Sequence, residues 1–416
     1  MLISIIIPTR ERARYLRHSL ATALAIDDDR LEIIVSDNAS TDGTRDLVTS
    51  LSDPRLRYLN TGDRVSMRMN FEFAFQHATG DYIISFGDDD GIIPGQFPML
   101  RHLLATRRPD AASWSLPAYG WPVDGYGTKV GGIRFTVHDC FGHPERVEPA
   151  EARMILESGQ MHQFSRLPRI YHGAMSRNLL DRMKDPAGVL FRARSPDIYA
   201  SFRAVVMGGT FDFYPHPFSI NGHSPASTGG SMNAVGDRQQ GGAADTRFLV
   251  ETRTDPVEDI IPITMSMALA YLGTAQTAAA VVPPQPFAPD YQRWYVAALR
   301  DMRRKGPEVA GMIDNSLIAH AAQFGAEKAL STARNSRGFD WSILTHKLSQ
   351  GLGKIRKANS FRLLAEADGM NTIETAARMC DIVLAQDAEE ILAGKMKPAE
   401  AWQRAIGRSG GYARQM

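Results

Sequence analysis

Short apolar runs alternate with amphipathic stretches along the first 116 residues of the chain. The apolar runs predict strands at residues 2–7, 31–36, 56–60, 81–87 and 111–116. The stretches between them have apolar side chains at helical spacing and predict helices at residues 13–25, 44–51, 66–77 and 96–106. This alternation is typical of a parallel sheet that is covered by helices on both faces. The first part of the chain is therefore predicted to be a doubly wound α/β unit.

The alternation ends after residue 117, where a stretch rich in Gly, Pro and aromatic residues predicts long loops. Residues 221–245 are poor in large apolar residues and rich in Gly and Ser, which predicts a mobile loop and a domain boundary. From about residue 250 helical patterns dominate and no strand is predicted. One helix is expected to begin at Asn371, with Glu374 completing a capping box. We expect an α/β domain over 1–230, a linker over 231–250 and a mainly helical region over 251–416.

Composition and charge narrow the class of protein. The chain has 416 residues, of which 44% are hydrophobic, and this is enough to bury a core and excludes a disordered chain. A formal net charge of +1 provides no overall field for nucleic acid, so no nucleic-acid partner is expected. The two cysteines, Cys140 and Cys380, have no metal or redox spacing, which suits a reducing compartment. A cytoplasmic location is therefore expected.

Two apolar segments need to be distinguished from membrane or export signals. The first ten residues contain no basic region and no cleavage site, so they predict a buried strand and not a signal peptide. Residues 260–289 contain no charged side chain, but they include Pro, Gly, Gln, Ser and Thr. A membrane span needs about 20 predominantly apolar residues. We therefore expect a buried helix, or one that supports self-association, in this second segment.

Acidic residues follow several of the predicted strands. In a doubly wound sheet, ligands bind beyond the carboxyl ends of the strands. Asp27, Asp28 and Asp29 precede a strand, so they are expected at the opposite edge as a solvated turn, whereas Asp37 and Asp42 follow one. Asp42 suits a helix-capping role, and Asp37 could accept hydrogen bonds from a base or a ribose.

The acidic triplet of residues 88–90 comes directly after the fourth strand. Carboxylate oxygens are suitable ligands for Mg²⁺ or Mn²⁺, and a cation held there could neutralise a bound diphosphate. Taken alone, however, an Asp-rich turn after a strand is more often structural. Its interpretation depends on the neighbouring motifs.

Three motifs together resemble the nucleotide-sugar half of a family 2 glycosyltransferase with the GT-A fold. They are IIIPTRER at 5–12, IIVSDNASTDGT at 33–44 and GDYIISFGDDDGIIPG at 80–95. The segment MNFEFAFQHATGDYI also resembles the helix before the metal-binding strand in that family. The resemblance covers about the first hundred residues.

The resemblance implies a set of site residues. At the nucleobase end of the donor, Pro8, Thr9 and Arg10 would line the pocket and Asp37 would lie near the base, which is usually uracil. Toward the rest of the donor, the binding residues would be Arg68, Asn70, Asp88 and Asp89. The metal ligands would be Asp88 and Asp90, joined by His223, which could equally be a surface residue. Gly91 departs from the family, since many relatives have another Asp there. Arg12, Arg14 and Arg17 are expected on a solvated helix face.

The catalytic base implied by the resemblance is Asp197, next to Pro196 at a predicted helix start in RARSPDIYASFRAVV. A hydroxyl is a poor nucleophile until a carboxylate takes its proton. An Asp in a first helical turn can also stabilise the helix dipole alone, and the local sequence does not separate these roles.

Four aromatic residues surround the loop after the fifth strand. Trp114, Tyr119, Trp121 and Tyr126 could stack on sugar faces as an acceptor platform, or they could pack within the loop. The sequence leaves both interpretations open.

The implied function is metal-dependent, inverting transfer of a hexose. The donor would be a nucleoside diphosphate sugar, with UDP expected, and the acceptor a sugar or lipid-linked glycan, as in surface polysaccharide synthesis. Mn²⁺ or Mg²⁺ would stabilise the departing diphosphate. Because no Gln-x-x-Arg-Trp motif and no convincing span are present, a processive membrane synthase is not favoured.

Two other classes stay open at this stage. One is a non-catalytic GT-A-like scaffold, and the other is a haloacid dehalogenase-like phosphatase, which would place Thr or Val where Ile92 stands. A basic stretch in the helical region suits either a solvated helix pair or peripheral contact with the inner face of a membrane. Its charged residues are Lys347, Lys354, Arg356, Lys357 and Arg362.

Overall fold

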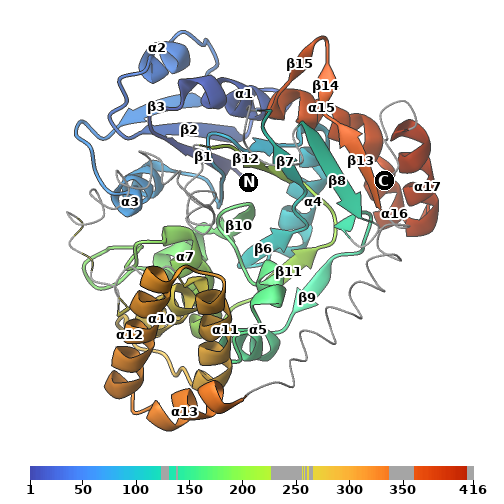
Figure 1. Cartoon of the computed structure of the whole chain (residues 1–416). Coiled ribbons are helices and arrows are strands. Elements are labelled where there is room, and N and C mark those ends of the chain that lie inside the picture. The colour runs from blue at the N-terminus through green and yellow to red at the C-terminus, as the bar shows by residue number, and fades with distance from the viewer. Residues whose placement is uncertain are drawn as a thin grey trace.

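An eight-stranded mixed sheet forms the centre of the computed structural model (Figure 1). The model describes residues 1–122, 131–136, 139–225, 255, 257, 260–261, 266–336 and 360–409. The strand order is β3-β2-β1-β4-β10-β6-β11-β9. The strands are β1 (Ile3–Thr9), β2 (Leu31–Asp37), β3 (Leu56–Asn60), β4 (Tyr82–Ser85), β6 (Ala111–Trp114), β9 (Glu145–Val147), β10 (Gly173–Ser176) and β11 (Phe211–Tyr214). The first four are parallel, and β10 runs antiparallel between β4 and β6.

Helices cover both faces of this sheet because its central strands are apolar on both sides. In β1, Ile5 and Ile7 lie in one apolar cluster with helices α1 (Ala13–Leu24) and α4 (Phe97–Arg107). Ile6 points to the other face, in a cluster with helices α3 (Met67–His77), α5 (Pro149–Glu157), α6 (Arg177–Met183) and α7 (Pro196–Met207). This alternation follows from the period of two in a strand. The predicted doubly wound α/β class is confirmed, and α2 (Thr44–Thr49) lies where a helix was predicted.

A second sheet of five described strands extends from the acidic triplet toward the C-terminal part of the chain. Its order is β13-β8-β7-β12-β5. The strands are β5 (Gly91–Ile92), β7 (Ala118–Gly120), β8 (Gly132–Thr136), β12 (Ser219–His223) and β13 (Ser360–Leu364). A small pair, β14 (Glu366–Ala367) and β15 (Met370–Asn371), follows β13. The expectation of no strand beyond residue 250 is therefore wrong, because β13 is stabilised by pairing with the distant strand β8 and has little local pattern of its own.

The C-terminal helices form two groups on different sides of the α/β unit, as Figure 1 shows in orange and red. The first group packs on α7 and contains α10 (Met267–Ala280), α11 (Tyr291–Arg303), α12 (Pro307–Gln323) and α13 (Glu327–Asn335). The second packs on α1 and β5 through α15 (Ile373–Leu384), with α16 (Asp387–Leu392) and α17 (Pro398–Ser409) beside it. The helical character predicted for this region is confirmed, and it is divided between two locations.

Two details of the helical region refine the sequence analysis. Helix α10 lies in the charge-free segment and is a buried helix, with Leu269 and Leu272 fully covered. In the described part of the chain, no helix has both the length and the apolar character that crossing a membrane requires. Helix α15 starts one residue later than predicted, because Thr372 is the N-cap and forms a reciprocal capping box with Thr375.

Some sequence predictions fall outside the described residues. These are the linker 231–250, Tyr126 and four residues of the basic stretch, namely Lys347, Lys354, Arg356 and Lys357. Arg362, the fifth basic residue, belongs to β13.

Candidate active site

The carboxyl ends of β1, β2 and β4 meet at one edge of the large sheet. Thr9 at the end of β1 is the register partner of Asp37 at the end of β2. The hydroxyl of Thr9 also donates a hydrogen bond to Asp88 Oδ2 at 2.7 Å. The predicted convergence of the first, second and fourth strands is therefore observed, and the acidic triplet faces Thr9.

Asp88 carries a protein counter-charge. The guanidinium Nη1 of Arg12 lies 3.0 Å from Asp88 Oδ1. Burial opposes the charged form of Arg12, but the carboxylates of Asp88 and Asp89 raise its pKa above the usual value. The expectation that Arg12 lies on a solvated helix face is wrong, because it precedes α1 and turns back onto the strand ends.

Asp90 is held by donors from three different parts of the chain. Its Oδ1 accepts from the N–H of Gly222 at 2.7 Å, and its Oδ2 accepts from the N–H of Gly87 at 2.7 Å and from the hydroxyl of Tyr171. Nε2 of His172 lies 3.1 Å from the same Oδ2. Burial disfavours ionisation of Asp90, but His172, Tyr171 and the Gly87 amide together lower its pKa. Asp90 therefore ties β10, β12 and the acidic turn together.

Asp89 differs from its two neighbours because, among the described residues, no cationic side chain bonds to it. Its Oδ2 accepts from the hydroxyl of Ser224 at 2.5 Å, and its backbone oxygen accepts from Trp121 Nε1 at 2.8 Å. Burial and the charges of Asp90 and Asp88 raise the pKa of Asp89 to about 8. Asp89 therefore holds its proton up to about neutral pH, whereas the lowered pKa of Asp90 keeps that carboxylate charged.

The arrangement does not fit the predicted metal ligands. Both oxygens of Asp90 accept from protein donors, and the two oxygens of Asp88 accept from Thr9 and Arg12. His223 is exposed, and its Nε2 lies 3.3 Å from Asn221 Nδ2. Within the described ranges, no group of three or more His, Cys, Asp or Glu side chains is placed to hold a metal ion. Asp88 and Asp90 already accept hydrogen bonds on both oxygens, and with His223 exposed the three predicted ligands do not form a ready site for an ion.

The predicted donor-binding residues have different environments. Thr9 contacts the acidic turn, and Pro8 and Arg10 are half-buried beside it. Asp37 is fully buried and accepts from Ser40 N, Tyr58 and Asn60. These partners account for its carboxylate by folding alone.

Arg68 and Asn70 are not where a donor-facing role would place them. Arg68 is buried and forms an ion pair with Asp255, 2.8 Å from Nη2 to Oδ1. Asn70 exchanges hydrogen bonds with Ser36 on β2. Both side chains therefore connect α3 to other parts of the fold. The sequence offered no signal for Asp255, since it lies 187 residues from Arg68.

Asp197 lies in the first turn of α7, and Pro196 is the first helical residue, as predicted. Burial raises the pKa of Asp197, opposed by the backbone N–H groups of Ile198 and Asp197. The pKa of Tyr171 is raised above its usual value by burial, by Asp90 and Asp89, and also by the charge of Asp197. Burial and the same Asp197 charge raise the pKa of Tyr271 on α10 to about 12. The charge of Asp197 therefore acts on Tyr171, which bonds to the acidic turn, and on Tyr271 of the helical region.

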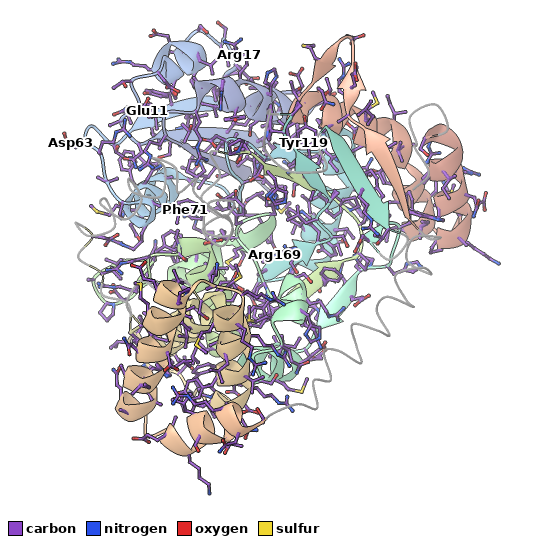
Figure 2. All side chains as sticks on the ribbon, viewed as in Figure 1. Glu11, Arg17, Asp63, Phe71, Tyr119 and Arg169 are labelled. Atoms are coloured by element: carbon purple, nitrogen blue, oxygen red, sulfur yellow. The ribbon has the colours of Figure 1, made fainter. Side chains whose placement is uncertain are left out.

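The aromatic residues after β6 do not form an open platform. Trp114 and Tyr119 are fully buried and Trp121 is 6% exposed. Their polar atoms bond to Ser219, to Asn371 and to the backbone of Asp89, respectively. Figure 2 shows Tyr119 inside the second sheet. The packing interpretation is correct for these three residues because each is buried and bonded within the fold, Tyr119 by Asn371 of the C-terminal segment.

The departure at Gly91 has a structural reason. A Cβ atom at Gly91 would lie 2.8 Å from Cγ1 of Ile373 on α15. This is closer than carbon atoms pack, so the side chain found in many relatives has no room here. The C-terminal helix α15 thus packs directly on the strand that follows the acidic turn.

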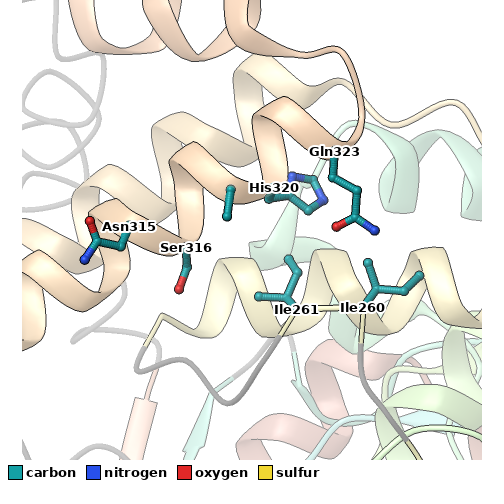
Figure 3. Close-up of a pocket in the computed structure, with 7 residues that line it drawn as sticks. Ile260, Ile261, Asn315, Ser316, His320 and Gln323 are labelled. Atoms are coloured by element: carbon teal, nitrogen blue, oxygen red, sulfur yellow. The ribbon is translucent and has the colours of Figure 1, made fainter.

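A separate pocket lies in the helical region (Figure 3). It has a volume of about 270 Å³ and is lined by Ile260, Ile261 and residues of α12. His320 in its wall bonds to Tyr295 and Gln276, and burial lowers the pKa of His320 to about 4. The pocket shares no lining residue with the strand-end site.

Comparison with known proteins agrees with the strand-end motifs. Residues 4–156 match the family model described as Glycosyl transferase family 2. Over 101 residues the chain is 32% identical to GalNAc(5)-diNAcBac-PP-undecaprenol beta-1,3-glucosyltransferase of Campylobacter jejuni, which covers 24% of this chain and 33% of the relative. Over 110 residues it is 34% identical to abequosyltransferase RfbV of Salmonella typhimurium, covering 25% and 33%. The chain thus spans about a third of the length of the curated relatives it matches.

Solved structures overlap more loosely. S. aureus TarS 1–349 in complex with UDP-GlcNAc gives a TM-score of 0.45 at 12% identity, covering 82% of this chain and 93% of that one. A mannosyltransferase from Pyrobaculum calidifontis in complex with GDP-Man and Mn²⁺ gives 0.38 at 16% identity, covering 81% and 87%. The family match and the mixed sheet confirm the expected fold class, a GT-A domain followed by a mainly helical region. The part of the chain from residue 4 to residue 156 is thus similar to glycosyl transferase family 2.

Proposed function

We propose that the chain is an inverting glycosyltransferase. It would transfer a hexose from a nucleoside diphosphate donor, UDP in the first instance, to a sugar or lipid-linked glycan acceptor in surface polysaccharide synthesis. The observation that carries the proposal is the position of Tyr171, which donates to Asp90 of the acidic turn and whose pKa is raised by burial, by Asp90 and Asp89, and also by the charge of Asp197. Under the proposal, the donor-side turn and the candidate base act on the same substrate pair, with Tyr171 between their charges. The family match of residues 4–156 supports the same reaction class.

The acceptor hydroxyl is the group that needs activation. Asp197 would take the hydroxyl proton while the acceptor oxygen attacks the anomeric carbon from the side opposite the leaving group. The bond between that carbon and the diphosphate oxygen breaks, and the nucleoside diphosphate leaves with inversion. A carboxylate whose pKa is raised by burial is a stronger base than an exposed one, which suits this role.

The donor would bind at the ends of β1, β2 and β4. Thr9 and Asp88 lie at its centre, and Arg12 supplies a positive charge beside them. A positive charge near the departing diphosphate stabilises the negative charge that develops there. Arg12 is a donor-side residue that the motif resemblance alone did not include.

Catalysis is tested by Asp197→Asn, with Glu308→Gln as the matched control. Glu308 also follows a proline at the first position of a helix, α12, but lies outside the site. Release of UDP from a panel of UDP-sugars would be measured with sugar and lipid-linked acceptors, and UDP affinity by calorimetry. We expect Asp197→Asn to keep UDP affinity and to lose transfer by about 100-fold or more, the usual size of a general-base effect. Normal transfer by this variant would refute the assignment, and UDP binding by the wild-type chain without turnover would favour the scaffold alternative.

A requirement for Mn²⁺ or Mg²⁺ stays a prediction from the sequence. It is tested by titrating the chain with UDP in the presence of Mn²⁺ and, separately, of a chelator. Tighter UDP binding with Mn²⁺ would support the requirement and would imply that the carboxylates of the turn exchange protein donors for the ion. Equal affinities in the two conditions would contradict it.

A further inference from the structure

Arg169 lies at the same sheet edge as the acidic turn. The backbone on its C-terminal side pairs with the end of β4, because Ile170 O accepts from Ser85 N at 2.9 Å and His172 N donates to Ser85 O at 2.8 Å. Its Nη2 donates to the backbone oxygen of Trp114, the last residue of β6. Figure 2 labels Arg169 near the centre of the molecule, above the orange helices. The guanidinium is therefore placed between the carboxyl ends of β4 and β6.

The charge of Arg169 has no counter-charge in the described residues. Its Nε is buried and has no hydrogen-bond partner within the described part of the chain. Burial alone lowers the pKa of Arg169 to about 10, with no carboxylate raising it. A cation removed from water without a paired anion is costly, and a fold retains one when something offsets the cost.

Arg169 is half-buried, and two buried arginines show how this fold satisfies such a group. Arg68 pairs with the carboxylate of Asp255. Arg203 also has an Nε without a partner in the described residues, but its Nη1 and Nη2 donate to the oxygens of Ala278, Val281 and Pro283 at the C-terminal end of α10, where the helix dipole is negative. Each of these side chains joins two elements through several acceptors. Arg169 has a single described acceptor, so scaffolding accounts for less of its guanidinium.

We propose that Arg169 binds a phosphate oxygen of a bound substrate. The inference rests on the proposed function, since the substrates of that reaction carry phosphate and Arg169 is two residues from Tyr171, which contacts the acidic turn. A guanidinium is planar and always charged, and it offers two parallel N–H groups that match two phosphate oxygens. The unpartnered Nε is one of these donors. The phosphate is either the diphosphate of the donor or a phosphate of the acceptor.

The test uses the full chain with Arg169→Gln and Arg169→Lys, and Arg166→Gln as the matched control. Arg166 is three residues away, but its charge is already paired with Glu145 and Glu151. Calorimetry would measure binding of UDP and of uridine to the free chain, and of pyrophosphate to the UDP-saturated chain. Thermal melting of each variant establishes that it is folded.

Two results support the inference and identify the source of the phosphate. If Arg169 binds the donor, Arg169→Gln lowers the affinity for UDP about tenfold or more and leaves the affinity for uridine unchanged. If it binds the acceptor, UDP affinity is unchanged and pyrophosphate binding to the UDP-saturated chain is lost. In both cases Arg169→Lys is expected to retain part of the binding, because it keeps the charge and loses the planar fork.

Unchanged UDP and pyrophosphate binding in Arg169→Gln would overturn the inference, and so would equal losses in Arg166→Gln. If Arg169→Gln does not fold, the same affinities are measured for Arg169→Lys. A loss of UDP or pyrophosphate affinity of at least threefold then supports the inference, and a smaller loss overturns it. Failure of the wild-type chain to bind UDP would sink the proposed function itself. A wild-type chain that binds UDP with no effect of Arg169 would sink only this inference.

Discussion

The contact between Gly91 and Ile373 predicts that a methyl group added at position 91 lowers the stability of the protein. It also predicts that this loss disappears when Ile373 is shortened to Ala. In Gly91→Ala, the new Cβ would lie 2.8 Å from Cγ1 of Ile373 and 3.4 Å from Cγ2 of Thr22. Ile373 is fully buried in the main apolar cluster, so it has no free space into which it can move. Backbone strain does not contribute, because Gly91 does not have a positive φ. The perturbation is therefore steric.

The magnitude follows from the packing. Inserting a methylene-sized group into a well-packed core costs about 1–3 kcal/mol. Ile373→Ala removes the clashing atom and leaves a cavity, which costs about 2–5 kcal/mol. In the double variant the methyl group added at position 91 has room and fills part of that cavity. We therefore expect the double variant to be more stable than the sum of the single effects predicts, by about 1 kcal/mol or more.

Urea unfolding of the wild type, both single variants and the double variant gives this coupling energy, provided that the four m values agree. Gly311→Ala on α12 is the control, since its Cβ meets nothing within 4 Å. This control should be stabilised by about 0.5–1 kcal/mol through helix propensity. Additivity of the Gly91 and Ile373 effects within about 0.5 kcal/mol would refute the proposed packing of α15 on the acidic turn.

Two further predictions concern neighbouring contacts. Burial raises the pKa of Asp381 to about 6, although the N–H of Gly95 donates to it at 3.0 Å. The folded state therefore binds the proton of Asp381 more tightly than the unfolded state does. This contribution to stability is present at low pH and is lost as pH rises from about 4 through 6. Asp381→Asn should remove that decline and unfold at higher urea than the wild type at pH 7.5 but not at pH 3.5, and parallel pH profiles of the two proteins would contradict the assignment. At Gly222 a Cβ would lie 1.8 Å from the backbone oxygen of Asp89. Gly222→Ala should therefore displace β12 from the acidic turn and weaken UDP binding at least tenfold. Calorimetry measures this effect, with Gly311→Ala as the control. Unchanged UDP affinity in Gly222→Ala would show that the donor does not depend on this contact.

The strand ends could be predicted from the sequence because they depend on local periodicity. The runs of β1, β2 and β4 are apolar and end in Thr9, Asp37 and Ser85, and parallel pairing then brings the residues that follow to one edge. The same reasoning placed Pro196 at the start of α7. These features need no knowledge of distant partners.

The partners of the site residues could not be predicted in this way. Arg12 bonds to a residue 76 positions away, and Arg68 to one 187 positions away. A charged side chain on an amphipathic segment gives the same local pattern whether it is solvated or paired across the fold. The burial of Trp114 and Tyr119 likewise depends on distant contacts, since Tyr119 bonds to Asn371 across the second sheet.

The division of the C-terminal helices into two groups links these distant contacts to the proposed chemistry. The group that begins with α10 is fixed to α7 through Arg203, and α7 carries Asp197. The group that begins with α15 is fixed to the strand after the acidic turn through Ile373. Under the proposed function, one group therefore supports the helix of the base and the other supports the donor side. Substitutions that weaken the packing of the two groups should therefore have different effects. A substitution at Ile373 should weaken donor binding first. A substitution at Arg203 should lower the rate of transfer while donor binding persists.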